Sequence, residues 1–430
     1  MIKLSSFFKT VVIGCTMIMM GYLQIFPITN IGNFKFICQI IVALIGMLMA
    51  FIVLILLFKN TGDNYSSPDY RYEYKLLNFY IVPYIIILII EILNTQLLYH
   101  YNLSVMINSL LPYLYIFWAY PLIYIFDNEK SIYPLLKTIC KLAILMIVIK
   151  FIGWFFYNYK GINLFQNLVL ETTDWIRNGK QRIDVTPLFG ITFVYYFYRF
   201  LITNKRRFIN LMIIVALIGY LILVTQVRYQ TIVVVLTGLI MIYFIPEKNG
   251  YGRLGKLIVT FLLLLGMITG GIAAIIELFS VNGINGASTV VRFEGIQHFL
   301  NIMKNTNHYL IGLGMMSQWN GVSEQLLYRN QWSYYYLSDL GIIGEFIIFG
   351  VLGIIVYGLM FYFFIKTDMK LKDRWQRVAL TGLLAYLIMS SLSLNVFDLS
   401  RSFDVPFYFA IFSYMNSMDK QQGIISKNEE

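Results

Sequence analysis

The chain has 430 residues, of which 59% are hydrophobic and only 13% are charged, and its mean hydropathy is +0.70. Soluble globular chains are nearer half apolar and a quarter charged, so this composition excludes a soluble enzyme, a disordered chain and a small disulfide-held secreted domain. The three cysteines all fall in apolar runs, which favours neither a disulfide nor a metal site. We interpret the net charge of +11 as a consequence of positively charged loops on one side of a membrane, and we expect no nucleic acid as partner.

Apolar runs long enough to cross a bilayer recur along the whole chain. A spanning helix needs about 20 mostly apolar residues, and the sequence predicts about twelve of them in a single membrane domain, residues 1–430. The fold class is therefore all-α integral membrane. In chain order the predicted spans are 10–28, 36–58, 76–98, 104–126, 133–157, 185–203, 208–225, 230–246, 256–278, 334–365, 377–397 and 403–418. The tenth is long enough to tilt or to project from the membrane.

The distribution of positive charge predicts the orientation of these helices. Short cytoplasmic loops carry an excess of Lys and Arg, and 22 of the 33 Lys and Arg residues fall on one side together with both termini. We therefore expect both termini to be cytoplasmic. Two long connections, 158–184 and 279–333, then lie outside, and the larger joins spans nine and ten. Long loops are uncommon unless they have a function, so we expect both to cap the outer face.

Four charged residues fall within predicted spans, all in the outer half of the membrane: Glu91, Lys150, Glu277 and Glu345. Each costs about 2.5–3.5 kcal/mol on insertion scales, so each needs a partner or a wet cavity. Two interpretations remain open. One is a polar cavity that opens outward, and the other is a Glu91–Lys150 ion pair combined with side chains that reach the interface.

Arg228 lies in the short turn between spans seven and eight, within Thr225–Gln230. The tight turn and its polar neighbours would fix the position of its guanidinium. Arg228 either binds an anionic ligand at the outer boundary of the membrane or is an ordinary interfacial arginine that contacts lipid headgroups.

Residues 288–304 predict an amphipathic helix in the larger loop. At 100° per residue, one face collects Glu294, Gln297, His298, Asn301 and Lys304, and the other collects Phe293, Ile296, Phe299, Leu300 and Met303. Arg292 falls on the apolar face, where an unpaired guanidinium would lose hydration without compensation. Arg292 therefore needs an anion, either a bound ligand or an internal partner such as Asp339 or Glu345.

Two further motifs follow this helix. In Tyr309–Gly314, the glycines Gly312 and Gly314 flank one residue, which lets a backbone turn sharply or approach a ligand closely. Span ten then places Asp339 near its outer mouth, with Glu345 six residues deeper, roughly 9 Å along a helix.

The order of three of these pieces is typical of one membrane family. They are Thr225-Gln226-Val227-Arg228, the helix that runs from Thr289 through Arg292 towards Gly312-x-Gly314, and Leu337-Ser338-Asp339-Leu340-Gly341-Ile342-Ile343-Gly344. Together they resemble the O-antigen ligase and Wzy-type polysaccharide polymerase family. The matching stretch covers about 220–360, a third of the chain. Ligase members of this family place a histidine about eleven residues before the glycine equivalent to Gly341. This chain has Asn330 there, so the resemblance favours a polymerase.

The resemblance implies a metal-independent, inverting glycosyltransferase without a cofactor, on the outer face of the cytoplasmic membrane of a bacterium. Its donor would be an oligosaccharide on undecaprenyl pyrophosphate, whose phosphates Arg228 and Arg292 would hold. Membrane lipids would surround it, and a flippase and a chain-length regulator are further expected partners.

An acceptor hydroxyl needs a base within hydrogen-bond reach, and the candidates are Asp339, Glu345 and His308. We expect the substrate to be bound by Arg228, Arg292, Arg401, Gly312, Gly314, Trp332 and Tyr335. The aromatic side chains would stack on sugar rings, although residues of a headgroup belt have the same signature.

The sequence thus predicts a polymerase of lipid-linked repeat units that makes a capsule, an exopolysaccharide or an O-antigen-like glycan. A flippase for the same lipid, or another twelve-span carrier, is the competing interpretation. Carriers usually have repeats and paired broken helices, and neither is evident in the sequence. The third interpretation is a ligase that transfers the glycan to another acceptor.

Overall fold

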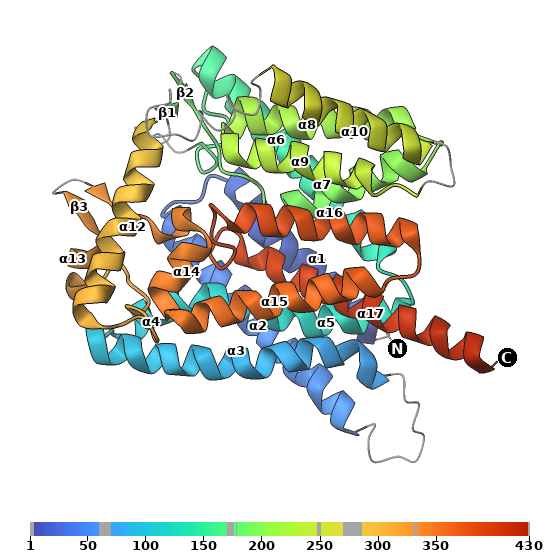
Figure 1. Ribbon diagram of the computed structural model, residues 1–430. Coiled ribbons are helices and arrows are strands. Elements are labelled where there is room, and N and C mark those ends of the chain that lie inside the picture. Colours follow the sequence, from blue (N-terminus) through green and yellow to red (C-terminus); the bar gives the residue numbers. More distant parts are fainter. Residues whose placement is uncertain are drawn as a thin grey trace.

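The computed structural model describes residues 4–59, 70–169, 176–177, 179–246, 251–269, 286–330 and 333–428. Helices make up almost all of the regular structure in these ranges, and the strands form only two short antiparallel pairs (Figure 1). The prediction of an all-α membrane protein is confirmed at this level.

The helices are α1 (Leu4–Met20), η1 (Tyr22–Ile25), α2 (Ile31–Lys59), α3 (Tyr70–Tyr99), α4 (Leu103–Leu114), η2 (Tyr115–Trp118), α5 (Ala119–Glu129), α6 (Tyr133–Lys160), α7 (Phe189–Ile202), α8 (Arg207–Tyr220), η4 (Leu221–Thr225), α9 (Arg228–Tyr243), α10 (Tyr251–Ile268), α12 (Gly286–Thr306), α13 (Gly321–Leu327), η6 (Leu337–Leu340), α14 (Ile342–Phe349), α15 (Val351–Lys370), α16 (Arg374–Ser391), η7 (Ser402–Asp404) and α17 (Val405–Asn428). The strands are β1 (Ile176–Arg177), β2 (Lys180–Gln181), β3 (Tyr328–Asn330) and β4 (Ser333–Tyr334).

Polar caps define several helix boundaries that hydropathy alone leaves vague. The side chains of Asn102, Asn320 and Asp373 accept hydrogen bonds from the first free backbone N–H groups of α4, α13 and α16. Gly161 ends α6 with a φ of 68°, the left-handed conformation that glycine adopts without strain.

Six stretches of the described chain are long and apolar enough to cross a membrane. They are Ile31–Lys59, Tyr74–Tyr99, Leu103–Glu129, Tyr133–Lys160, Arg207–Thr225 and Val351–Lys370, and the shorter apolar helices are α1, α7 and α9. The predicted ninth span, 256–278, overlaps α10 and then leaves the described residues, as does Glu277.

Helix α2 shows why these helices suit a bilayer. Val42, Met49 and Val53 on one face are buried in the bundle, whereas Leu48 and Phe51 on the other face are exposed apolar side chains. A continuous exposed apolar face is a liability in water but is satisfied by lipid.

The bundle has two distinct ends (Figure 1). Both chain termini lie at one end, and the strands, α12 and α13 lie at the other, which we call the capped end. Helix α17 packs against α3, α5 and α15 between the two ends, with Phe407, Phe409 and Phe412 fully buried.

The predicted tenth span, 334–365, is interrupted, so the prediction of one continuous span that tilts or projects from the membrane is wrong. Gly350, with a φ of 62°, separates α14 from α15. The break leaves backbone N–H and C=O groups that a membrane interior cannot hydrate. Residues of the 309–314 segment form hydrogen bonds with these groups. Leu313 and Gly314 donate to the carbonyls of Ile347 and Ile348 over 2.8 and 3.1 Å, and Val351 donates to the carbonyl of Tyr309 over 2.9 Å.

Broken helices also occur in carriers. The interrupted helix therefore removes one sequence-based reason for preferring an enzyme to a carrier.

Candidate functional site

Helix α12 lies at the capped end and covers the residues 288–304 that were predicted to be helical. Phe299 and Met303 are fully buried, while Gln297 and Lys304 are exposed. Phe293 departs from the prediction because it is 54% exposed.

His298 also departs from the prediction, since it lies half-buried between other rings. Its ring centre lies 5.1 Å from that of Phe299 and 5.2 Å from that of Tyr335. Its Nε2 lies 2.9 Å from the carbonyl oxygen of Leu326. Tyr335 explains the difference, because it packs over Gly295 and gives the histidine a neighbour that helical periodicity cannot predict.

Arg292 lies in the N-terminal half of α12, within electrostatic range of Tyr229 in α9. Within the described part of the chain, its side chain makes no hydrogen bond or ion pair. Neither Asp339 nor Glu345 is its ion-pair partner, so that alternative is wrong. The neighbouring arginine on β3 is different, because Arg329 pairs with Glu294 over 3.0 Å.

The β1–β2 hairpin brings a further arginine to the turn that carries Arg228. A guanidinium nitrogen of Arg177 donates to the carbonyl of Gln226 over 2.8 Å, and the N–H of Ile183 donates to the carbonyl of Val224 over 3.2 Å. Gln226 has a φ of 52°, which turns the chain from η4 into α9. Two segments distant in sequence therefore meet at this turn.

Four arginines gather around this point, and we call Arg177, Arg182, Arg228 and Arg292 the arginine cluster. Burial, followed by the like charges of the other three guanidiniums, lowers the pKa of Arg177, and among the described residues the carboxylate of Asp339 acts in the opposite direction. Arg228 is exposed and, like Arg292, forms no ion pair within the described ranges. The positive charge of this cluster is therefore not neutralised by Asp339 alone. Guanidinium groups bind phosphate oxygens in bidentate fashion.

Asp339 lies in η6 at the edge of this cluster. It is half-buried, and its N–H donates to the carbonyl of Tyr336 over 3.1 Å. Its neighbour Ser338 lines the largest cavity described below. Arg228, Arg292 and Asp339 from the predicted site thus all lie within electrostatic range of Arg177.

Glu345 is fully buried in α14 inside a hydrogen-bond network. The side-chain amide of Asn395 donates to its carboxylate over 2.6 Å, and the hydroxyl of Tyr113 donates over 3.5 Å. Asn395 also accepts from Tyr357 over 2.9 Å. Glu345 therefore lies behind Tyr113 and Asn395, which both line the cavity of about 290 Å³ described below.

The alternative of a Glu91–Lys150 ion pair is wrong. The Nζ of Lys150 donates to the backbone carbonyl of Asp184 over 3.0 Å, whereas Glu91 accepts from Thr95 over 3.4 Å. Helices α3 and α6 carry these two residues in different parts of the bundle (Figure 1).

A cavity of about 290 Å³ lies at the capped end between α4, η6 and the segments 315–319 and 395–399; we call it the aromatic cavity. Tyr335, predicted to bind substrate, lines it together with Trp319 and Tyr336. Trp332, the other predicted aromatic residue, lies outside the described residues.

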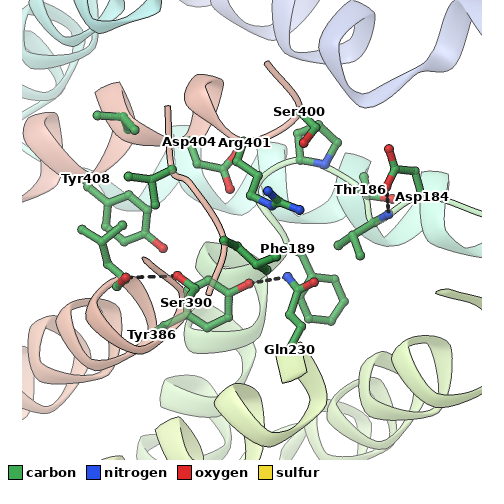
Figure 2. Close-up of a pocket in the computed structure, with 16 residues that line it drawn as sticks. Asp184, Thr186, Phe189, Gln230, Tyr386, Ser390, Ser400, Arg401, Asp404 and Tyr408 are labelled. Carbon is green, nitrogen blue, oxygen red and sulfur yellow. Dashed lines mark hydrogen bonds between the residues drawn. The ribbon is translucent and has the colours of Figure 1, made fainter. Parts of the chain in front are cut away.

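Arg401 lies in a different, smaller cavity of about 50 Å³ (Figure 2). Figure 2 shows its guanidinium between Asp404 and Thr186. It reaches the carboxylate of Asp398 only loosely, over 3.7 Å. Nearby, Gln230 donates to the hydroxyl of Tyr386 over 2.6 Å. Gln230 of α9 lines the cavity of Arg401, and Arg228 of the arginine cluster begins the same helix. Arg401 therefore lies near the arginine cluster but is not part of it.

Gly312 and Gly314 are buried in the segment that fills the helix break. Their φ values of 91° and 84° favour glycine, and an added Cβ would collide with the backbone of Ile348 at Gly312 and approach the ring of Tyr99 at Gly314. Packing accounts for both glycines.

His308 lies beyond the C-terminal end of α12. The 14 residues from Arg292 to Thr306 correspond to about 21 Å of helix, so the structure does not bring His308 to the arginine cluster.

Arg177 and Arg182 are the site residues that the sequence interpretation missed, because they counted only as positive charges in a loop. The available signal was a pair of arginines flanking Gly179 in a loop expected to cap the outer face. Both lie outside the stretch of about 220–360 that carries the family resemblance.

No group of three His, Cys, Asp or Glu side chains within the described ranges could hold a metal ion. Neither protein-family models nor curated proteins match this chain.

Proposed function

We propose that this protein is a glycosyltransferase that joins undecaprenyl-pyrophosphate-linked repeat units into a capsular, extracellular or O-antigen-like polysaccharide. It would act at the outer face of the cytoplasmic membrane of a bacterium, with about twelve spans and both termini cytoplasmic. The capped end, with the described part of the segment 279–333, would then face outward. The observation that carries the proposal is the arginine cluster beside Asp339.

The leaving group explains the need for several arginines. When the bond between the sugar and the phosphate breaks, its electron pair remains on a multiply charged lipid pyrophosphate. Preorganised cations directed at developing charge are often the largest catalytic contribution. Arg228 and Arg292, which have no ion-pair partner within the described ranges, would supply that stabilisation together with Arg177.

Asp339 is the proposed general base. The hydroxyl at the non-reducing end of an incoming repeat unit would attack the anomeric carbon of the growing chain, and Asp339 would accept the hydroxyl proton. One displacement inverts the anomeric configuration and releases one lipid pyrophosphate per linkage. Arginines and a carboxylate supply these roles without a metal ion.

A carrier for the same lipid is the second candidate, and the helix break at Gly350 is the observation that favours it. A flippase would also use arginines to hold a pyrophosphate. A ligase differs from the polymerase only in the acceptor that receives the glycan.

Purified protein in detergent, supplied with lipid-linked repeat units, tests the proposal. We expect the wild-type protein to produce elongated chains, and Arg292→Ala or Arg228→Ala to lower the rate by about 10²–10³. Arg292→Lys should recover little, because the ammonium group lacks the bidentate geometry.

Arg329→Ala is the matched control, since it removes an arginine that also contacts α12 but already has a carboxylate partner. Its rate should stay within a few-fold of wild type. Elongation at the normal rate by Arg292→Ala would contradict the proposal. Absence of product combined with lipid flipping in vesicles would instead identify a carrier.

A further inference from the structure

The aromatic cavity has features that packing does not explain. Trp319 is 75% exposed and Tyr336 is 56% exposed, although both line the cavity. Neither ring stacks on another aromatic side chain in the described part of the chain. Exposed aromatic rings at a cavity wall offer faces on which a ligand can stack.

Side chains with unused hydrogen-bonding capacity line the same cavity. Asn108 and Ser109 from α4 and Gln318 line the same cavity, and within the described ranges their side chains make no hydrogen bond to the protein. Amides and hydroxyls both donate and accept. A cavity of about 290 Å³ is close to the lower limit of small-molecule sites, roughly 300–1,000 Å³.

This combination selects one class of ligand. A sugar ring presents a C–H face that stacks on an aromatic ring and an edge of hydroxyl groups that pair with amides. An acyl chain would cover the rings but leave the amide groups of Asn108 and Gln318 without partners, at a cost for each.

The cavity adjoins the arginine cluster through a single short element. In η6, Ser338 lines the cavity, and the next residue, Asp339, lies within electrostatic range of Arg177. The N–H of Asn395 donates to the carbonyl of Ser338 over 2.9 Å, which ties η6 to another wall of the cavity. A ligand in the cavity would therefore lie next to the element that carries Asp339.

We infer that the aromatic cavity binds the acceptor oligosaccharide, with its non-reducing end directed towards Asp339. This inference rests on the proposed function, and it assigns the two substrates to separate sites: the donor pyrophosphate at the arginine cluster, and the acceptor sugars against Trp319, Tyr336 and Asn108. Variants of the two sites should consequently have separable effects.

Binding of two probes to the full-length protein in detergent tests this separation. The first probe is the lipid-free oligosaccharide released by mild acid from the lipid-linked repeat units of the producing cells, and the second is undecaprenyl pyrophosphate. We expect Trp319→Ala and Asn108→Ala to weaken oligosaccharide binding at least tenfold without changing binding of the lipid. Arg292→Ala should do the reverse.

In elongation assays, Trp319→Ala should raise the KM for the acceptor far more than it lowers kcat, and Trp319→Phe should restore most of the loss. Tyr362→Ala is the matched control for Tyr336→Ala, since Tyr362 is 54% exposed but lies on α15 and does not line the cavity.

The failures of the two proposals are distinguishable. If Trp319→Ala and Tyr336→Ala bind the oligosaccharide and elongate like wild type while Arg292→Ala is inactive, the acceptor assignment is wrong and the polymerase proposal stands. If a lipid acyl chain displaces the oligosaccharide, the cavity is a lipid site and the inference is overturned. Normal elongation by Arg292→Ala would contradict the polymerase proposal itself.

Discussion

Like charges held close together destabilise a folded protein unless opposite charges neutralise them. Arg177 illustrates this at the scale of single residues, because burial and three neighbouring arginines lower its pKa, while Asp339 among the described carboxylates opposes them. Such arrangements are typical of functional sites, where local stability is given up for binding. The arginine cluster is therefore the basis of the proposal that an anionic ligand binds there.

The two carboxylates predicted as bases have different surroundings, so their variants should behave differently. Asp339 lies beside the arginine cluster, whereas Glu345 is buried and bonded to Asn395. We expect Asp339→Asn to lower kcat for elongation by about 10²–10⁴ without changing the affinity for undecaprenyl pyrophosphate. Glu345→Gln should mainly lower the melting temperature. A stable Glu345→Gln protein with no activity, beside an active Asp339→Asn, would reverse the assignment.

Half of the arginine cluster could be predicted from the sequence, for identifiable reasons. Arg228 follows a span directly, and Arg292 violates an otherwise clear amphipathic pattern, so local rules reveal both. Arg177 belongs to a hairpin with strands of two residues each. Its position depends on hydrogen bonds to the 224–226 turn, almost 50 residues away, and no local pattern encodes such a contact.

At the scale of elements, the break between α14 and α15 illustrates the limit of hydropathy. The apolar run continues through Gly350, and an isolated glycine in a helical pattern is common enough to be passed over. What stabilises the break is the 309–314 segment, which supplies partners for the freed backbone groups. The helix break and the glycines that precede it are therefore one structural feature.

This interpretation predicts a large effect at Gly312 and none at a helical glycine nearby. An alanine Cβ at Gly312 would collide with the backbone at Ile348, so Gly312→Ala should destabilise the protein by more than about 1 kcal/mol. At Gly358, an exposed position in α15, a Cβ would meet nothing within 4 Å. Gly358→Ala should leave the protein unchanged or stabilise it by up to about 1 kcal/mol. Equal melting temperatures for the two variants would show that the segment does not support the break.

At the scale of the whole molecule, the class and the approximate helix positions could be predicted because a bilayer imposes them. Spanning segments must be long, apolar and helical, and α2, α3 and α6 all coincide with predicted spans. Hydropathy alone could not reveal the broken tenth span or the short hairpins at the capped end. Those features depend on contacts between distant segments.

The proposed orientation can be checked with single cysteines. After replacement of Cys15, Cys38 and Cys140, one cysteine is introduced at Lys304 or at Lys370, which are both exposed and lie towards opposite ends of the bundle. A membrane-impermeant maleimide should label Lys304→Cys in intact cells, and Lys370→Cys only after the membrane is opened. The opposite labelling would place the capped end in the cytoplasm and contradict a reaction at the outer face.

Binding of the lipid leaving group is the most direct test of the arginine cluster as a pyrophosphate site. The measurement is the melting temperature of the purified protein with undecaprenyl pyrophosphate or undecaprenyl phosphate. At a hundredfold excess over its Kd, a ligand stabilises the folded state by about 2.7 kcal/mol. We expect undecaprenyl pyrophosphate to raise the melting temperature of the wild type and of Arg329→Ala more than the monophosphate does. We expect no rise in Arg177→Ala, Arg228→Ala or Arg292→Ala. Equal stabilisation of all these variants, or no preference for the pyrophosphate, would contradict the account.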